Sequence, residues 1–158
     1  MSINTGRVAS LHLHPEKAGE AMRAVDSFEL VEEKGIRGTP RKFGAISRST
    51  GQPSKRQVTL IEREQIAEHA VALGLQTIAP GVVRSNIETL GVNLVALIGK
   101  QVQVGTATLL FYEARTPCEK MDRICQGLRE LMENQRQGVL AQVVRSGVIR
   151  VGDSICPV

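Results

Sequence analysis

Short apolar runs, many of them rich in β-branched residues and bounded by single glycines, form the main pattern of this chain. Such runs are typical of strands joined by turns. We predict eight strands, over residues 7–14, 24–31, 56–61, 85–89, 101–104, 107–113, 139–144 and 148–151. No internal repeat interrupts this pattern, so it does not indicate a solenoid or a propeller.

Two segments have the spacing of amphipathic helices. Residues 62–73 place Ile66, Ala70 and Leu73 on one face, and residues 119–133 carry a longer apolar stripe that includes Cys125. Eight short strands and only two helices do not alternate as βα units. We therefore predict a mostly β fold with appended helices, in which a largely antiparallel β-barrel forms one domain over residues 1–158.

Residues 35–53 predict no regular element, because glycines and prolines recur throughout the stretch. A connection of this length inside a compact domain is typically functional or disordered. The same region holds an unusual share of the charge. Residues 34–61 contain seven basic residues and no acidic ones, which leaves 13 basic and 16 acidic residues elsewhere. The net charge of +4 is therefore a +7 segment joined to a slightly acidic remainder.

Arginines on a glycine-rich loop suit the bidentate capture of phosphate or carboxylate. The basic segment thus predicts an anion site, either for a phosphorylated cofactor or for a nucleic-acid backbone. A solvated loop whose charge only maintains solubility is the alternative. Aromatic residues make up just 3% of the chain, which argues against stacking on single-stranded nucleic acid.

The three cysteines differ in context. Cys118 follows Pro117 and begins the predicted helix 119–133, where the helix dipole would favour the thiolate, the form that attacks electrophiles and ligates soft metals. A buried, inert thiol is the alternative. Cys125 lies on the apolar stripe and is predicted to be a small core residue, whereas Cys156 has no informative context.

The odd number of cysteines does not suggest a disulfide framework, and we expect a reducing, cytoplasmic setting. We also expect no signal peptide and no membrane span, since the apolar runs are too short. His12 and His14 share a face of the first strand, but no third ligand at recognisable spacing joins them, so we predict a partly exposed polar face. His69 is predicted to lie on the surface of its helix.

Several motifs, in order, resemble the MOSC domain, the family named for the C-terminal domain of molybdenum cofactor sulfurases. The resemblance runs through nearly the whole chain and rests on the order of its pieces. These are Gly6-Arg7-Val8, Gly35-Ile36-Arg37-Gly38, Arg56 with the apolar run after it, Pro80-Gly81, Arg84-Ser85-Asn86-Ile87, Gly105, Thr116-Pro117-Cys118, and the strands after Gly138 and Gly147.

The resemblance implies a β-barrel whose functional residue is Cys118. Members are thought to carry sulfur or to bind the molybdenum cofactor, a pterin with a phosphate tail, and in the amidoxime-reducing relatives the matching cysteine ligates molybdenum. By similarity, Arg56, Arg84 and Asn86 would line the cofactor pocket. From the basic segment, Arg41 and Lys42 join the predicted cofactor-binding set.

The resemblance further implies either a sulfur donor of the cysteine desulfurase type or an electron-transfer partner. Reduction of N-hydroxylated compounds is one activity it suggests. We expect no nucleic-acid partner and no pyridoxal phosphate site, because that cofactor belongs to a separate domain of the fused sulfurases.

One position departs from the family pattern. Relatives usually continue the glycine motif with Asp and often His, whereas here Gly38 is followed by Thr39-Pro40-Arg41. The change indicates either a more anionic ligand or the loss of part of the reaction. A noncatalytic barrel that binds anions or nucleic acid through the basic segment, and a degenerate member that only binds a partner protein, are the competing hypotheses.

Overall fold

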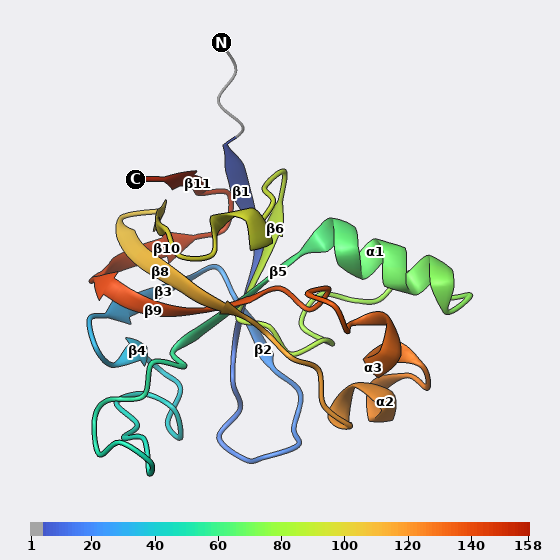
Figure 1. The fold of residues 1–158 in the computed structure, drawn as a ribbon, viewed down its shortest axis with the longest axis horizontal. Coiled ribbons are helices and arrows are strands. Elements are labelled where there is room, and N and C mark those ends of the chain that lie inside the picture. Colours follow the sequence, from blue (N-terminus) through green and yellow to red (C-terminus); the bar gives the residue numbers. More distant parts are fainter. Residues whose placement is uncertain (1–4) are drawn as a thin grey trace.

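Seven strands close into a barrel in the computed structural model, which describes residues 5–158 (Figure 1). Around the barrel each strand is hydrogen-bonded to the next, and the last returns to the first. The order is β1 (Gly6–Leu13), β6 (Ile87–Leu90), β5 (Val58–Glu62), β9 (Val139–Arg145), β8 (Ala107–Ala114), β7 (Gln101–Val104) and β11 (Ser154–Pro157). Only β5 and β6 pair in parallel, so the predicted, largely antiparallel β-barrel is confirmed.

A smaller sheet lies beside the barrel (Figure 1). It contains β10 (Gly147–Arg150), β3 (Ser27–Val31) and β4 (Gly35–Ile36), while β2 (Arg23–Val25) extends the barrel sheet next to β1. The predicted strand 24–31 is therefore two strands, which separate at Asp26 and belong to different sheets. β4 and β11 were not among the predicted strands. β4 has only two residues, in a hairpin with β3, and β11 is defined by long-range pairing with β7 and β1.

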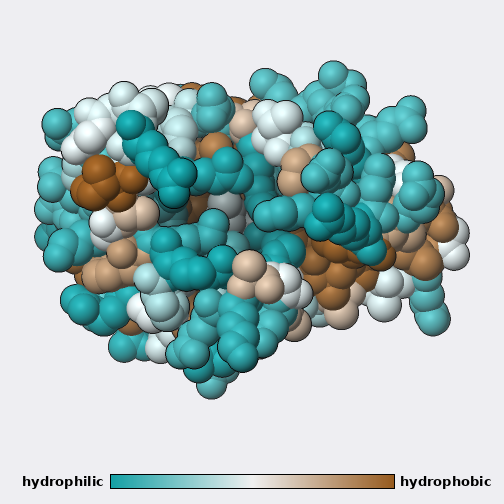
Figure 2. All heavy atoms as spheres, turned by 90° about the horizontal axis from the view of Figure 1, so that it is seen from below, coloured by the Kyte–Doolittle hydropathy of each residue, from teal (hydrophilic) through white to brown (hydrophobic). Residues whose placement is uncertain are grey.

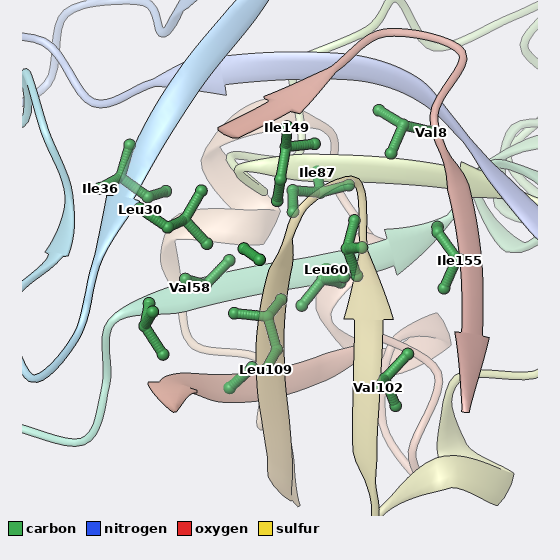
Figure 3. Packing of buried hydrophobic residues seen from close by; sticks show 14 of the residues in the cluster. Val8, Leu30, Ile36, Val58, Leu60, Ile87, Val102, Leu109, Ile149 and Ile155 are labelled. Atoms are coloured by element: carbon green, nitrogen blue, oxygen red, sulfur yellow. The ribbon is translucent and has the colours of Figure 1, made fainter. Parts of the chain in front are cut away.

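The barrel is filled by aliphatic side chains from alternate strand positions. Val58 and Leu60 of β5 point inward toward Leu109 of β8 and Ile87 of β6, as Figure 3 shows. All four side chains are fully buried. Burying one such side chain stabilises the fold by about 1.5–3 kcal/mol, so the apolar runs that predicted the strands also supply the barrel's stability.

A second, smaller core joins three helices at one end of the molecule (Figure 1). α1 (Arg63–Ala72) follows β5 directly and buries Ile66 against the region of α2 (Lys120–Ile124) and α3 (Leu128–Leu131). A 3-10 turn, η1 (Val95–Leu97), precedes β7. None of the helices described between residues 5 and 158 is long and apolar enough to cross a membrane.

The predicted helix 119–133 is broken into α2 and α3. Cys125 is extended, with φ −158°, and Gly127 adopts a left-handed conformation with φ +95°. The apolar spacing was a correct guide to burial, since Met121 and Leu128 are both buried, but one glycine with positive φ allows the chain to turn between them.

Candidate functional site

Cys118 lies at the surface, between the end of β8 and the start of α2. The backbone around it is fixed on both sides: the Arg115 amide donates to the Gly138 carbonyl at 2.9 Å, and the Met121 amide donates to the Cys118 carbonyl at 3.0 Å. Pro117 is buried, whereas Cys118 is exposed. The thiol is therefore held in a defined position and is accessible to a ligand.

The helix after Cys118 differs from the prediction. α2 begins at Lys120 and has only five residues, with Glu119 as its N-cap. Cys118 precedes the cap, and a helix of this length has a small dipole because few peptide units align. The charge near the thiol comes instead from Arg115, three residues earlier in the chain, which interacts electrostatically with Cys118.

Arg115 is the central cation of the site. Its Nη1 donates to the Arg84 carbonyl at 3.2 Å. The pKa of Arg115 is lowered to about 10, mainly by burial and also by the charges of Arg56 and Arg84, while Cys118 has the opposite effect. These influences place the guanidinium within electrostatic reach of both arginines and the thiol. The sequence offered one signal for Arg115, its position three residues before Cys118, and our prediction did not include it.

The basic loop reaches the same place. Burial lowers the pKa of Lys42, and the charges of Arg56, Arg115 and Arg41 lower it further. We call Arg41, Lys42, Arg56, Arg84 and Arg115 the cationic cluster. Among residues 5–158, none of its members forms an ion pair with an acidic side chain. Of the predicted site residues, the structure thus brings together Cys118, Arg41, Lys42, Arg56 and Arg84.

His14, at the end of β1, faces the cluster. Its pKa is lowered to about 3, mainly by burial and also by the charges of Lys42, Arg84, Arg115 and Arg41. The imidazole is therefore neutral at physiological pH. It has no hydrogen-bond partner within the described part of the chain. The sequence predicted a partly exposed polar position for His14, and its side chain is half-buried here; the cations around it could not be predicted because they come from distant segments.

A cavity of about 290 Å³ opens beside the cluster. Two cluster arginines hold its wall: Arg41 Nη2 donates to the Pro15 carbonyl at 3.3 Å, and Arg84 Nη1 donates to the Glu20 carbonyl at 2.9 Å. Viewed from below, the face between the 39–56 loop and helices α2 and α3 is mostly hydrophilic (Figure 2). The lining residues are His14, Pro15, Glu16, Glu20, Ala21, Arg23, Gly38 and Pro40.

Thr39 occupies the position where the family pattern has an acidic residue. Its side chain is buried, and its Oγ1 donates to the Ile36 carbonyl at 2.6 Å. The Thr39 carbonyl accepts the amides of Lys42 and Phe43. Thr39 therefore shapes the turn that presents Arg41 and Lys42, and it adds no negative charge to the site.

The segment that carries Arg84 is fixed by a buried ion pair. Arg63 Nη1 binds Glu88 Oε1 at 2.8 Å, and the other oxygen of Glu88 accepts the Gly81 amide, also at 2.8 Å. Arg63 also donates to the Ile78 carbonyl. Arg84 itself has φ +64°, an uncommon value for a residue with a side chain. The ion pair thus supports a strained turn at the site.

His12 and His69 are buried, contrary to our predictions for both. His12 Nδ1 donates to the Ser85 carbonyl at 3.0 Å, and His69 Nε2 donates to the Arg136 carbonyl at 2.9 Å. Each imidazole connects two segments that are far apart in the sequence, which a surface pattern could not indicate. Cys125 packs against the second core, as predicted.

Asn86 is placed differently from the cofactor-binding role implied by the resemblance. It is only 2% exposed, and its Oδ1 accepts both the amide and the hydroxyl of Thr59 at 3.0 Å. Its Nδ2 donates to the His12 carbonyl at 3.2 Å. The side chain therefore joins β5, β6 and β1 inside the barrel wall, and its predicted contact with a pterin has no support in this geometry.

The described residues contain no group of three or more His, Cys, Asp or Glu side chains arranged to hold a metal ion.

Comparison with known proteins identifies the family and the fold. The MOSC domain model matches residues 12–156. The chain belongs to the MOSC domain family, which is associated with the molybdenum cofactor. No curated protein shows significant similarity to it.

Solved structures share the fold of this MOSC domain. The YuaD protein from Bacillus subtilis is 20% identical, with a TM-score of 0.76 over 96% of this chain and 94% of that one. YiiM from Geobacillus stearothermophilus is 17% identical, with a TM-score of 0.73 over 97% of this chain and 75% of its own. YiiM from Escherichia coli is 21% identical, with a TM-score of 0.68 over 96% and 69%.

Proposed function

We propose that the protein binds the molybdenum cofactor, with Cys118 as the protein ligand to molybdenum and the cationic cluster holding the phosphate of the pterin. One observation carries this proposal. An accessible thiol lies beside Arg115, in a cluster of five cations that have no acidic partner in the described structure. Arg84 and Arg115 are partly buried without an ionic partner among the described residues, which is costly and favours an anionic ligand.

The residues fit the cofactor by their chemistry. Thiolate is a soft ligand suited to a thiophilic metal, and guanidinium groups bind phosphate through paired hydrogen bonds. Arg115 and Arg84 would orient the phosphate, while the rigid backbone around Cys118 would fix the sulfur. Neutral His14 can donate or accept one hydrogen bond at the ligand.

When bound, the cofactor supplies two-electron redox chemistry, which suits the reduction of N-hydroxylated compounds. This activity requires an electron-transfer partner, and we propose that both operate in the cytoplasm. Three free cysteines fit such a reducing setting.

The exposure of Cys118 also supports a second candidate, a sulfur carrier. In that role the Cys118 thiolate attacks the outer sulfur of a persulfide on a donor of the cysteine desulfurase type. A new S–S bond forms on Cys118, the donor S–S bond breaks, and the donor leaves as a thiolate. No net oxidant or reductant is needed for this exchange.

Pterin fluorescence and reduction of an N-hydroxylated test compound by natively purified protein test the main proposal. We expect both signals in the wild type and in Cys125→Ala, and neither in Cys118→Ala. If Cys118→Ala keeps both signals, the cofactor proposal is wrong. A wild-type protein without pterin whose intact mass rises by one sulfur atom after incubation with a persulfide donor would favour the carrier.

A further inference from the structure

A group of buried polar side chains lies beneath the turn that carries Arg84. His12 of β1, Ser85 and Glu88 are each at most 1% exposed. Buried polar groups lower stability unless they are fully hydrogen-bonded. Two atoms of this group, His12 Nε2 and the Ser85 hydroxyl, have no hydrogen-bond partner among the described residues. The group therefore carries a cost that stability alone does not explain.

The turn of residues 81–85, just before β6, is held at both of its ends. At one end the Gly81 amide donates to Glu88 Oε2 at 2.8 Å, and at the other His12 Nδ1 donates to the Ser85 carbonyl at 3.0 Å. Between these two anchors the Arg84 amide donates to the Gly81 carbonyl at 3.0 Å, and Arg84 has φ +64°. A residue with a side chain keeps this left-handed conformation only where its surroundings impose it. The two anchors impose it here.

The conformation of Arg84 affects the cations next to the thiol. The Arg84 carbonyl accepts Arg115 Nη1 at 3.2 Å, and Arg84 Nη1 donates to the Glu20 carbonyl at 2.9 Å. Arg115 in turn interacts electrostatically with Cys118. Two hydrogen bonds, joined through the backbone of the turn, therefore connect the buried imidazole of His12 with the cation beside the thiol.

We propose that His12 is a positioning residue of the site, whose Nδ1 hydrogen bond holds the 81–85 turn in the conformation that keeps Arg115 beside Cys118. Glu88 acts in the same way at the other end of the turn. The inference rests on the proposed function for the role of Cys118 and its cations. His12 itself is buried in the barrel wall and acts through the turn, without contact with a ligand.

Alkylation of Cys118 in the full chain, prepared in a host that does not make the cofactor, tests this assignment. Iodoacetate is negatively charged and iodoacetamide is neutral, so the ratio of their rates measures the positive potential at the thiol, and the thiolate fraction cancels. Peptide mass spectrometry distinguishes Cys118 from the other two free cysteines, Cys125 and Cys156. His12→Leu removes the hydrogen-bond donor and should lower the ratio about fivefold, the effect of one unit charge at contact distance with water-like screening.

Two variants separate positioning from a loss of stability. His12→Asn places an amide N–H at the position of Nδ1 and should keep the wild-type ratio. His69→Leu is the matched control, because His69 is also 1% exposed and its Nε2 donates to the Arg136 carbonyl at 2.9 Å. That bond joins α1 to a segment without a member of the cationic cluster, so His69→Leu should leave the ratio unchanged.

Arg63→Lys is the second variant if His12→Leu does not fold. Lysine keeps a cation opposite Glu88 but lacks the fork that also donates to the Ile78 carbonyl, so the 81–85 turn should loosen and the ratio should fall. An unchanged ratio in either folded variant overturns the assignment, as does an equal fall in His69→Leu or in His12→Asn. Because the assay uses neither molybdenum nor pterin, its failure is distinguishable from failure of the proposed function.

Discussion

The buried ion pair between Glu88 and Arg63 gives the sharpest stability prediction. Glu88 is fully buried, and its two oxygens bind Arg63 Nη1 and the Gly81 amide at 2.8 Å each. Glu88→Gln preserves the shape of the side chain but removes its charge, and it leaves Arg63 without its ionic partner. Removing one partner of a buried pair costs about 3–5 kcal/mol. The Arg63 side chain is 24% exposed, so water compensates in part and we expect the lower end, about 3 kcal/mol.

Urea unfolding followed by circular dichroism measures this loss directly. For a chain of this size, about 3 kcal/mol corresponds to a fall in Tm of about 6–12 °C. The matched control is Glu68→Gln, because Glu68 pairs with Arg136 at the surface, where both side chains are about half exposed. Such a pair contributes about 0–1 kcal/mol. If Glu88→Gln and Glu68→Gln destabilise the protein equally, the buried pair does not support the Arg84 segment as argued.

Three further predictions follow from the same geometry. Gly138→Ala should destabilise by about 3 kcal/mol or more in urea unfolding, because Gly138 has φ +81° and a Cβ would collide with the Leu60 carbonyl; an unchanged midpoint would contradict the placement of this turn. Arg115→Met should abolish phosphate binding in calorimetry yet raise or preserve Tm without anions, because it removes a partly buried cation that has no acidic partner; a large fall in Tm would contradict this. The folded pKa of His14, about 3, lies below its unfolded value, so the contribution of His14 to stability is complete above about pH 6.5 and declines as the pH falls toward 3. His14→Gln should therefore flatten the fall in the urea midpoint across that pH range. An unchanged slope would refute the lowered pKa of His14.

The barrel could be predicted because its information is local. Apolar runs bounded by turn residues, such as those that hold Leu60 and Leu109, mark the buried strands within a few residues, and pairing then follows from the need to cover their apolar side chains. The same reasoning failed at residues 119–133, where apolar spacing continues through Gly127 although the helix does not.

The site was only partly predictable, because it is assembled from distant segments. The basic loop and Cys118 have recognisable sequence signals, but the proximity of Lys42 to Arg115 depends on how β1, β8 and the 39–56 loop meet. Asn86 illustrates the opposite case. Its side-chain amide lies in a family motif, yet it is buried in the barrel wall, where it forms hydrogen bonds with Thr59 and His12.

The molybdenum content of natively purified protein, measured by inductively coupled plasma mass spectrometry, tests the central claim most directly. The account predicts stoichiometric molybdenum in the wild type and in the matched Cys125→Ala variant, and a loss of molybdenum in a folded Cys118→Ala variant. Equal molybdenum in all three proteins, or none in a wild type expressed in a host that makes the cofactor, would contradict it.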